Sequence, residues 1–167
     1  MNLKALWVNP FKKKSTDIEG EISFLSSVPV FDSLSTRQHR TLYSIMHTRN
    51  FNEGEIVCRK GDPGVGLYII RDGNVDVYNE FPDLTRLRIA SLESGDFFGE
   101  ISLLNDSPRS ATVVAVRPTV LLGLFRHDLL EIMDSDPTLG VKLVYRLSQI
   151  VAERLRLVNV PTDLESQ

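Results

Sequence analysis

The sequence predicts an α+β fold in which a β-barrel lies between N-terminal and C-terminal helices. The hydrophobic pattern changes twice along the chain. Residues 21–48 show helical spacing, residues 51–125 consist of short β-branched and aromatic runs broken by glycines, and helical spacing returns from residue 126. Short strands separated by turns at this interval are typical of a β-sandwich or barrel. The order of helices, barrel and helices therefore follows from the pattern alone.

Length and composition predict a single soluble domain. The 167 residues are 42% hydrophobic and 25% charged, and they leave no room for a second domain of ordinary size. The single cysteine, Cys58, cannot form an internal disulfide. The net charge of -3 provides no basic field for nucleic acid, and the apolar runs are too short to cross a bilayer. We expect a cytoplasmic protein that does not bind DNA.

Residues 1–20 are expected to form an arm outside the folded domain. They combine apolar side chains, among them Trp7 and Phe11, with three consecutive lysines at positions 12–14. This pattern favours an arm that packs on the domain or on a partner. Contact of residues 1–14 with an anionic membrane surface is the alternative.

Helical signals bound the barrel on both sides. Ser35 and Gln38 have the spacing of a capping box, and Asp136 followed by Pro137 is a typical helix start. Apolar residues at steps of three and four predict one buried face on the last helix, a stripe that is also compatible with a homodimer: Val144, Leu147, Val151, Leu155 and Val158. We expect helices at 21–48, a barrel at 51–125 and helices at 126–159, within a domain of residues 21–160 followed by a tail at 161–167.

Two glycine patterns in the barrel region are expected to mark turns. The segment Arg71–Asn74 holds an Asp-Gly dipeptide between two strand-like runs, which predicts a β-hairpin. The segment Gly64-Val65-Gly66 resembles part of a dinucleotide fingerprint, but it precedes a strand where the fingerprint requires it to follow one. We interpret it as a turn.

The sequence predicts neither catalysis nor metal binding. The sequence shows no recognisable combination of a nucleophile, a base that would activate it and a third group that would orient the base. His39, His47 and His127 are scattered, without acidic companions at useful spacing, and His39 and His47 lie among polar neighbours. We therefore expect no enzyme activity, no catalytic cofactor and no metal site.

The segment from Phe98 to Thr112 is the most informative part of the chain: Phe-Gly-Glu-Ile-Ser-Leu-Leu, then Asn-Asp-Ser, then Pro-Arg-Ser-Ala-Thr. Gly99 has no Cβ, so a ligand can approach the backbone there, and a helical turn that starts at this point directs its N–H groups at an anion. Arg109 offers a planar fork of donors suited to a phosphate, whereas the carboxylate of Glu100 suits a sugar hydroxyl. Together these residues predict a cradle for one monoanion.

This segment resembles the phosphate-binding cassette of the cyclic nucleotide-binding domains, which occur in the catabolite activator, protein kinase A regulatory subunits and cyclic-nucleotide-gated channels. The cassette of that family runs Phe-Gly-Glu, two small or apolar residues, Leu, a short loop, Pro-Arg, a small residue and Ala-Thr, and Phe98 to Thr112 fits it throughout. The resemblance extends from about Pro29 to the last helix, most of the chain. It implies a jelly roll, or double-stranded β-helix, of about eight strands, in a stand-alone member of the bacterial type.

The resemblance also implies a role for each matching position. Arg109 and the amides of Ser110 and Ala111 would hold the cyclic phosphate, and Gly99 and Glu100 would take the ribose 2′-hydroxyl. Further expectations are base contacts at Val77, Ile89 and Leu92, a lid at Val158 and Asn159, and a switch in which Ile101 packs against Leu129. Many relatives have phenylalanine at this last position, so the strength of the coupling stays open.

Two choices within this reading stay open. Glu100 and Arg109 can instead form an internal salt bridge in a domain that has lost its ligand. A hydroxyl residue after the arginine, here Ser110, can bond a syn guanine in this family, yet bacterial cyclic AMP binders also carry serine there. We favour cyclic AMP over cyclic GMP as the ligand.

The expected function is a cyclic nucleotide sensor that signals to a separate effector protein through closure of its terminal helices. One alternative is an adaptor that binds a protein partner without nucleotide. The other is a truncated transcription regulator or channel gating domain, although only residues 161–167 follow the last helix, too few for a helix-turn-helix.

Overall fold

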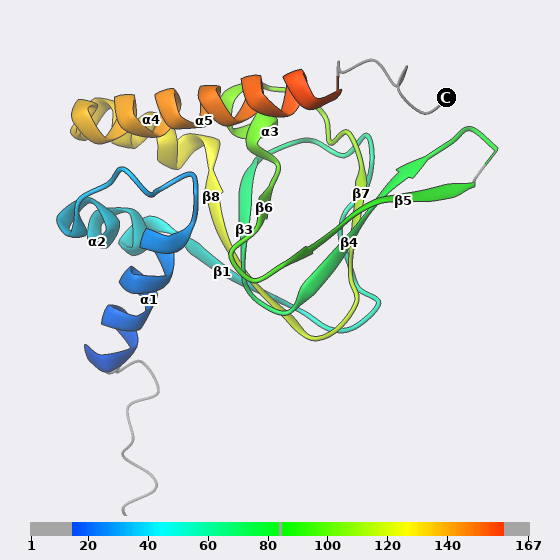
Figure 1. Cartoon of the computed structure of the whole chain (residues 1–167), viewed down its shortest axis with the longest axis horizontal. Helices are drawn as coiled ribbons and strands as arrows, with labels where there is room; N and C mark the ends of the chain where they lie inside the picture. The colour runs from blue at the N-terminus through cyan, green and yellow to red at the C-terminus, as the bar shows by residue number, and fades with distance from the viewer. Residues whose placement is uncertain (1–14, 84, 159–167) are drawn as a thin grey trace, which may run out of the picture.

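The computed structural model describes residues 15–83 and 85–158, and Figure 1 shows a strand-rich body with helices on one side. Eight strands within these residues form two antiparallel four-stranded sheets, which confirms the predicted α+β jelly roll. The helices are α1 (Ser15–Ser27), α2 (Thr36–Ile45), α3 (Glu100–Leu104), α4 (Arg126–Ser135) and α5 (Pro137–Val158). The strands are β1 (His47–Phe51), β2 (Ile56–Cys58), β3 (Gly66–Asp72), β4 (Asn74–Glu80), β5 (Arg86–Glu93), β6 (Phe97–Phe98), β7 (Thr112–Ala115) and β8 (Thr119–Phe125).

The described residues cover only part of the expected arm and none of the expected tail. Helix α1 begins at Ser15, so the expected limit between arm and domain at residue 20 falls inside this helix. The membrane or partner contact expected of residues 1–14, the lid residue Asn159 and the tail at 161–167 lie outside the described residues. No helix among residues 15–83 and 85–158 has the length and apolar character needed to cross a membrane.

The predicted hairpin at Arg71–Asn74 is wrong, because the turn there joins strands of different sheets. Strand order is β1-β8-β3-β6 in one sheet and β2-β7-β4-β5 in the other. Both edges of β3 are already occupied, by β8 and β6, so β4 pairs with β5 and β7 instead. Gly73, at φ +96°, makes the turn, and a Cβ on it would lie only 2.6 Å from the Cα of Thr119.

One hydrophobic core joins the helices to the first sheet. It contains Leu25 of α1, Leu42 of α2 and Leu124 of β8, all fully buried. The capping box that starts α2 is confirmed, since Ser35 and Gln38 bond each other's backbone amides. The core therefore holds α2 and the barrel together on the side away from the second sheet.

The buried face of α5 matches the predicted stripe at Leu147 and Val144 but not at Leu155. Leu139, Leu143 and Leu147 are fully buried, whereas Leu155 is 60% exposed. The helix packs on α4 and on the core as far as Ile150, which lies partly buried against the core. Figure 1 shows its second half extending over the barrel, toward the end that carries β4, β5 and β7. The second half is thus free to cover whatever lies at that end.

The buried carboxylate of Asp76 joins β4 to β5. It accepts hydrogen bonds from the hydroxyl of Ser91 and, at 3.2 Å each, from Arg88 and Tyr78. These bonds, that of Ser91 first, hold the pKa of Asp76 below its usual value. Because the pKa of Asp76 is lower in the folded chain than in the unfolded chain, its ionised form stabilises the fold at pH values above the unfolded pKa of about 3.9. This stabilisation is lost as the pH falls through the folded pKa.

We therefore expect Asp76→Asn to lower the free energy of unfolding more at pH 7 than at about pH 3, which lies below the unfolded pKa of about 3.9, so that part of this stabilisation has already been lost. Urea denaturation at the two pH values measures the difference. Asp134→Asn, an exposed carboxylate on α4, is the matched control and should show no such dependence. Equal losses for Asp76→Asn at both pH values would contradict the assigned role.

Candidate functional site

The segment from β6 to β7 folds as a compact loop against the first sheet. Gly99, at φ +85°, ends β6 and starts the short helix α3. A Cβ on Gly66 would lie 2.7 Å from the Cα of Phe125, and one on Gly64 would lie 2.3 Å or so from neighbouring atoms of Ser102 and Ser107. The Gly64-Val65-Gly66 segment is therefore not the turn that was expected: it is a close-packed, irregular approach whose last residue begins β3, and the loop packs against it.

Arg109 carries a buried charge that is not neutralised by the described residues. Its side chain is only 6% exposed, and Nη1 is buried without a hydrogen-bond partner among them. The backbone is fixed at both ends, because the Arg109 N–H donates to the Asp62 carbonyl and the Arg109 carbonyl accepts from the Gly61 N–H, both at 2.8 Å. The guanidinium lies 5.5 Å from the centre of the Tyr68 ring. Such an arginine is ready to pair with an anion.

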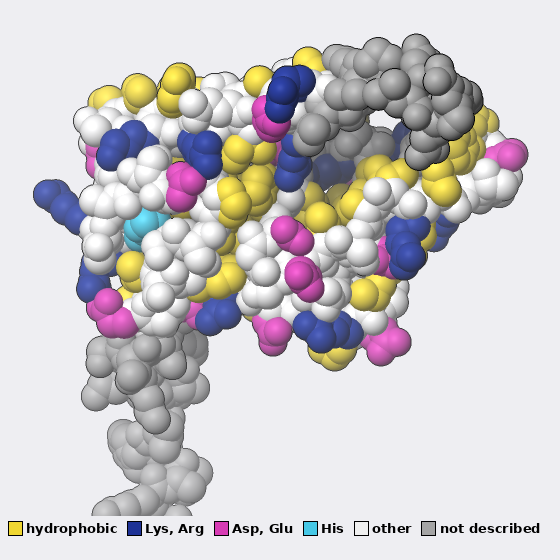
Figure 2. All heavy atoms as spheres, viewed as in Figure 1, with side chains coloured by type: hydrophobic (Ala, Val, Ile, Leu, Met, Phe, Trp, Pro, Cys, Tyr) yellow, Lys and Arg dark blue, Asp and Glu magenta, His cyan; other side chains and the backbone are white. Residues whose placement is uncertain are grey.

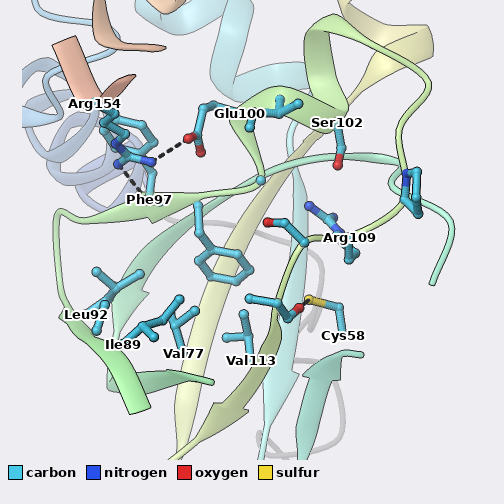
Figure 3. Close-up of a pocket in the computed structure, with 17 residues that line it drawn as sticks. Cys58, Val77, Ile89, Leu92, Phe97, Glu100, Ser102, Arg109, Val113 and Arg154 are labelled. Atoms are coloured by element: carbon cyan, nitrogen blue, oxygen red, sulfur yellow. Dashed lines mark hydrogen bonds and ion pairs between the residues drawn. The ribbon is translucent and has the colours of Figure 1, made fainter. Parts of the chain in front are cut away.

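A cavity of about 410 Å³ opens beside Arg109. Figure 2 shows a hollow on this face below the helices, with hydrophobic side chains along its wall. The cavity brings together eight residues that the sequence predicted for the site: Val77, Ile89, Leu92, Gly99, Glu100, Arg109, Ser110 and Ala111. Figure 3 shows Arg109 at one end and the apolar group of Leu92, Ile89 and Val77 at the other. The site therefore has a cationic end and an apolar end.

Glu100 is paired with an arginine that the sequence did not single out. Arg154 of α5 donates to Glu100 Oε1 at 2.6 Å and to the Phe97 carbonyl at 3.4 Å, and its guanidinium lies 4.8 Å from the centre of the Phe97 ring. Figure 3 shows this pair at the top of the cavity. The alternative of an internal Glu100 to Arg109 salt bridge is contradicted, since neither residue pairs with the other.

Cys58 and Ser102 also line the cavity and were not predicted. Burial raises the pKa of the Cys58 thiol, partly offset by the positive charge of Arg109. The group is therefore a neutral thiol at pH 7. Only the position of β2 beside β7 could have suggested it, since Cys58 pairs in register with Val113.

The two residues of the expected switch, Ile101 and Leu129, lie in different surroundings. Ile101 lines the cavity and is 48% exposed, whereas Leu129 is buried in the core. The residue of α3 that shares the core cluster with Leu129 is Leu103. Helical spacing explains the difference, because Ile101 and Leu103 point to different sides of α3. The expected lid residue Val158 is the last residue of α5.

The histidines are not scattered, contrary to expectation. His39 is buried, and its Nε2 lies 3.0 Å from the Phe31 carbonyl, so its surroundings are not polar neighbours in solvent. His47 and His127 converge on the carboxylate of Asp128, with Nε2 to Oδ distances of 3.4 and 3.1 Å. Strand β1 carries His47 to α4 across the fold, and no local spacing could have revealed this approach.

Comparisons with known proteins agree with this geometry. A family model described as "Cyclic nucleotide-binding domain" matches residues 48–136. The cyclic AMP receptor protein of Thermus thermophilus is 33% identical, over 83% of this chain and 62% of the receptor. A cGMP-dependent protein kinase of Plasmodium berghei is 39% identical, over 62% of this chain and 12% of the kinase. The solved structure of a cyclic nucleotide-binding domain from Methylobacillus flagellatus gives a TM-score of 0.74 at 29% identity, over 89% of this chain and 87% of that one.

The chain spans less than two thirds of the length of these two relatives, the bacterial receptor and the kinase. The matched residues nevertheless contain every strand and the loop that carries Gly99, Glu100 and Arg109, apart from the first residue of β1. They span more than half of the sequence. The chain belongs to the cyclic nucleotide-binding domain family.

Proposed function

We propose that the cavity beside Arg109 binds cyclic AMP in preference to cyclic GMP, and that binding is signalled to a separate effector protein. The observation that carries this proposal is the buried guanidinium of Arg109, whose Nη1 has no partner among the described residues, at one end of a cavity of about 410 Å³. A single negative charge placed there gains a strong, desolvated partner. No catalytic step is part of the proposal, and the setting we propose is the cytoplasm.

The cavity offers suitable side chains or backbone groups for each part of a cyclic nucleotide. The cyclic phosphate would pair with Arg109 and the amides of Ser110 and Ala111, and the ribose hydroxyl would bond Glu100 beside Gly99. Apolar side chains would contact the base: Val77, Ile89 and Leu92. A cavity with one cationic end and one apolar end suits a ligand that has one negative charge and one apolar part.

The preference for cyclic AMP rests on the apolar end of the cavity. Guanine carries a carbonyl, a ring N–H and an amino group on its pairing edge, whereas adenine carries an amino group and a ring nitrogen. Burial of more polar groups without partners costs more free energy. Ser110 is exposed and offers one hydroxyl, which satisfies at most part of the guanine edge.

The signal would pass through Arg154. This residue links the last helix directly to Glu100, the proposed ribose ligand. A nucleotide that bonds Glu100 adds a hydroxyl to the same carboxylate and brings its base under α5, so bound and empty chains favour different positions of that helix. We also propose Val158 and Asn159, at the end of α5 and beyond it, as the residues that close over the base.

Isothermal titration of the purified chain with cyclic AMP and cyclic GMP tests the proposal, after mass spectrometry has shown that no nucleotide co-purifies. We expect a dissociation constant near 1 μM or tighter for cyclic AMP, about -8 kcal/mol, and weaker binding of cyclic GMP. Linear 5′-AMP, which has an open phosphate with a second charge, is the control ligand and should bind more weakly. An empty, folded chain that binds neither cyclic nucleotide would overturn the proposal and favour a protein-interaction adaptor.

A further inference from the structure

A second cluster of chemically active side chains lies where the barrel meets the terminal helices. His47 is the first residue of β1, and His127 and Asp128 lie in the first turn of α4, directly after β8. Figure 1 shows β8 leading into α4, away from the end that carries β4 and β5. None of the three residues lines the cavity beside Arg109. We call them the His47–His127–Asp128 cluster.

The carboxylate at the centre of this cluster is fixed in place. Asp128 is 7% exposed, and its Oδ2 accepts a hydrogen bond from the Phe125 N–H at 2.9 Å, which caps the start of α4. The ring of Phe125 stacks on both imidazoles, at centroid distances of 4.8 Å for His47 and 5.9 Å for His127. One carboxylate and two rings therefore hold a set position before any ligand arrives.

Of the two nitrogen atoms that face this carboxylate, one lacks a hydrogen-bond partner among the described residues and the other belongs to an exposed ring. His47 Nε2 is buried and makes no hydrogen bond within the described residues, although it lies 3.4 Å from Asp128 Oδ2. His127 Nε2 lies 3.1 Å from Asp128 Oδ1, on a side chain that is 71% exposed. One side of the cluster is thus closed by the protein, and the other is open to solvent.

The separations match those of ligands around a transition metal ion. Zinc binds imidazole nitrogen at about 2.0–2.1 Å and carboxylate oxygen at about 2.0–2.2 Å in tetrahedral geometry, so neighbouring ligand atoms lie about 3.4 Å apart. One ligand atom from each of the three side chains lies within 4.8 Å of the other two, so a small shift of the exposed His127 ring completes the arrangement. Two imidazoles with one carboxylate suit zinc and its neighbours better than Mg²⁺ or Ca²⁺, which prefer oxygen alone.

We propose that His47, His127 and Asp128 form a binding site for a divalent transition metal ion such as Zn²⁺, with water at the open fourth position. The bond from the Phe125 N–H to Asp128 orients the carboxylate ligand. A metal ion at this place ties β1 to the first turn of α4, the helix on which α5 packs. This proposal does not depend on the proposed nucleotide binding, so either of the two can fail without the other.

Equilibrium dialysis of the untagged full chain against ZnCl₂ tests the site, and the visible absorption of bound Co²⁺ reports tetrahedral nitrogen and oxygen ligands. We expect one ion per chain. His127→Ala removes an exposed ligand without opening the core and should weaken binding at least ~10-fold. Asp128→Asn should do the same, and Asp134→Asn, on the same helix and exposed, should leave binding unchanged.

A further variant separates this site from the thiol. Cys58→Ser should leave Zn²⁺ binding as it is, because Cys58 lies in the other cavity. Loss of binding in Cys58→Ser, or unchanged binding in His127→Ala, would overturn the proposal. So would the absence of binding by the folded parent chain, which would leave Asp128 as a helix cap that two histidines share.

Discussion

Arg109→Ala is expected to weaken cyclic AMP binding by roughly thirtyfold to a thousandfold, or about 2–4 kcal/mol. The guanidinium is buried, and its Nη1 has no other partner among the described residues, so the bound phosphate would lose its charged donor and stay desolvated. Because the backbone around Arg109 is held by Gly61 and Asp62, the loop is expected to keep its position in the variant. Isothermal titration of parent and variant measures the loss.

Two further variants make this result specific. Arg117→Ala removes the same charge from an exposed position outside the cavity and should change binding by less than twofold or so. Arg109→Lys keeps the charge but loses the planar fork, so its affinity should fall between those of the parent and Arg109→Ala. If a folded Arg109→Ala chain lost less than about threefold in its affinity for cyclic AMP, the assignment of this arginine to the phosphate would be wrong.

Glu100→Ala is expected to have the second largest effect, a loss of about tenfold or more for cyclic AMP and much less for 2′-deoxy cyclic AMP. The reason is that the carboxylate is the proposed acceptor for the ribose hydroxyl, which the deoxy ligand lacks. The structure adds a second reason, since the variant also releases Arg154 and so loosens the hold of α5 on the cavity. Titration with both nucleotides separates the two contributions.

Arg154→Gln provides the matched comparison. It removes the ion pair to Glu100 but leaves the proposed ribose acceptor in place, so losses for the two nucleotides should be similar and smaller than for Glu100→Ala. The double variant should show coupling, because Glu100 and Arg154 are in direct contact. Equal losses for cyclic AMP and the deoxy ligand in Glu100→Ala would remove the ribose role and leave only the link to α5.

Most of the site that the sequence predicted is encoded in one stretch, and the rest, Val77, Ile89 and Leu92, lies on β4 and β5. Gly99, Glu100, Arg109, Ser110 and Ala111 all lie within one motif, and the structure places them around one cavity. Their order along the chain fixes which residue types meet, since a short helix and a tight loop leave few ways to arrange them. The barrel was predictable for a similar reason, because alternating short runs and turns are local signals.

The features that were missed or wrong depend on contacts between distant segments. Arg154 reaches Glu100 only because α5 crosses the open end of the barrel, and its own neighbours in sequence give no sign of this. The Asp-Gly dipeptide at Gly73 has the local signal of a hairpin. Strand β3 nevertheless pairs with β6 and β8, so it does not pair with β4, the strand that follows the turn. His47 meets His127 through the same kind of long-range pairing, that of β1 with β8.

Strand β8 pairs with both β1 and β3, so the first sheet depends on a strand that comes late in the barrel segment. The first sheet cannot close until residues 119–125 have been synthesised, so β1 and β3 wait with unpaired edges while most of the domain is made. Helices α4 and α5 follow at once and cover the apolar surface that β8 completes. Arg154, the partner of Glu100, lies in the second half of α5 and so is among the last described residues to be synthesised. We expect a nascent chain without α5 to lack the ion pair between Arg154 and Glu100, so the proposed nucleotide should bind with full affinity only after α5 has been made.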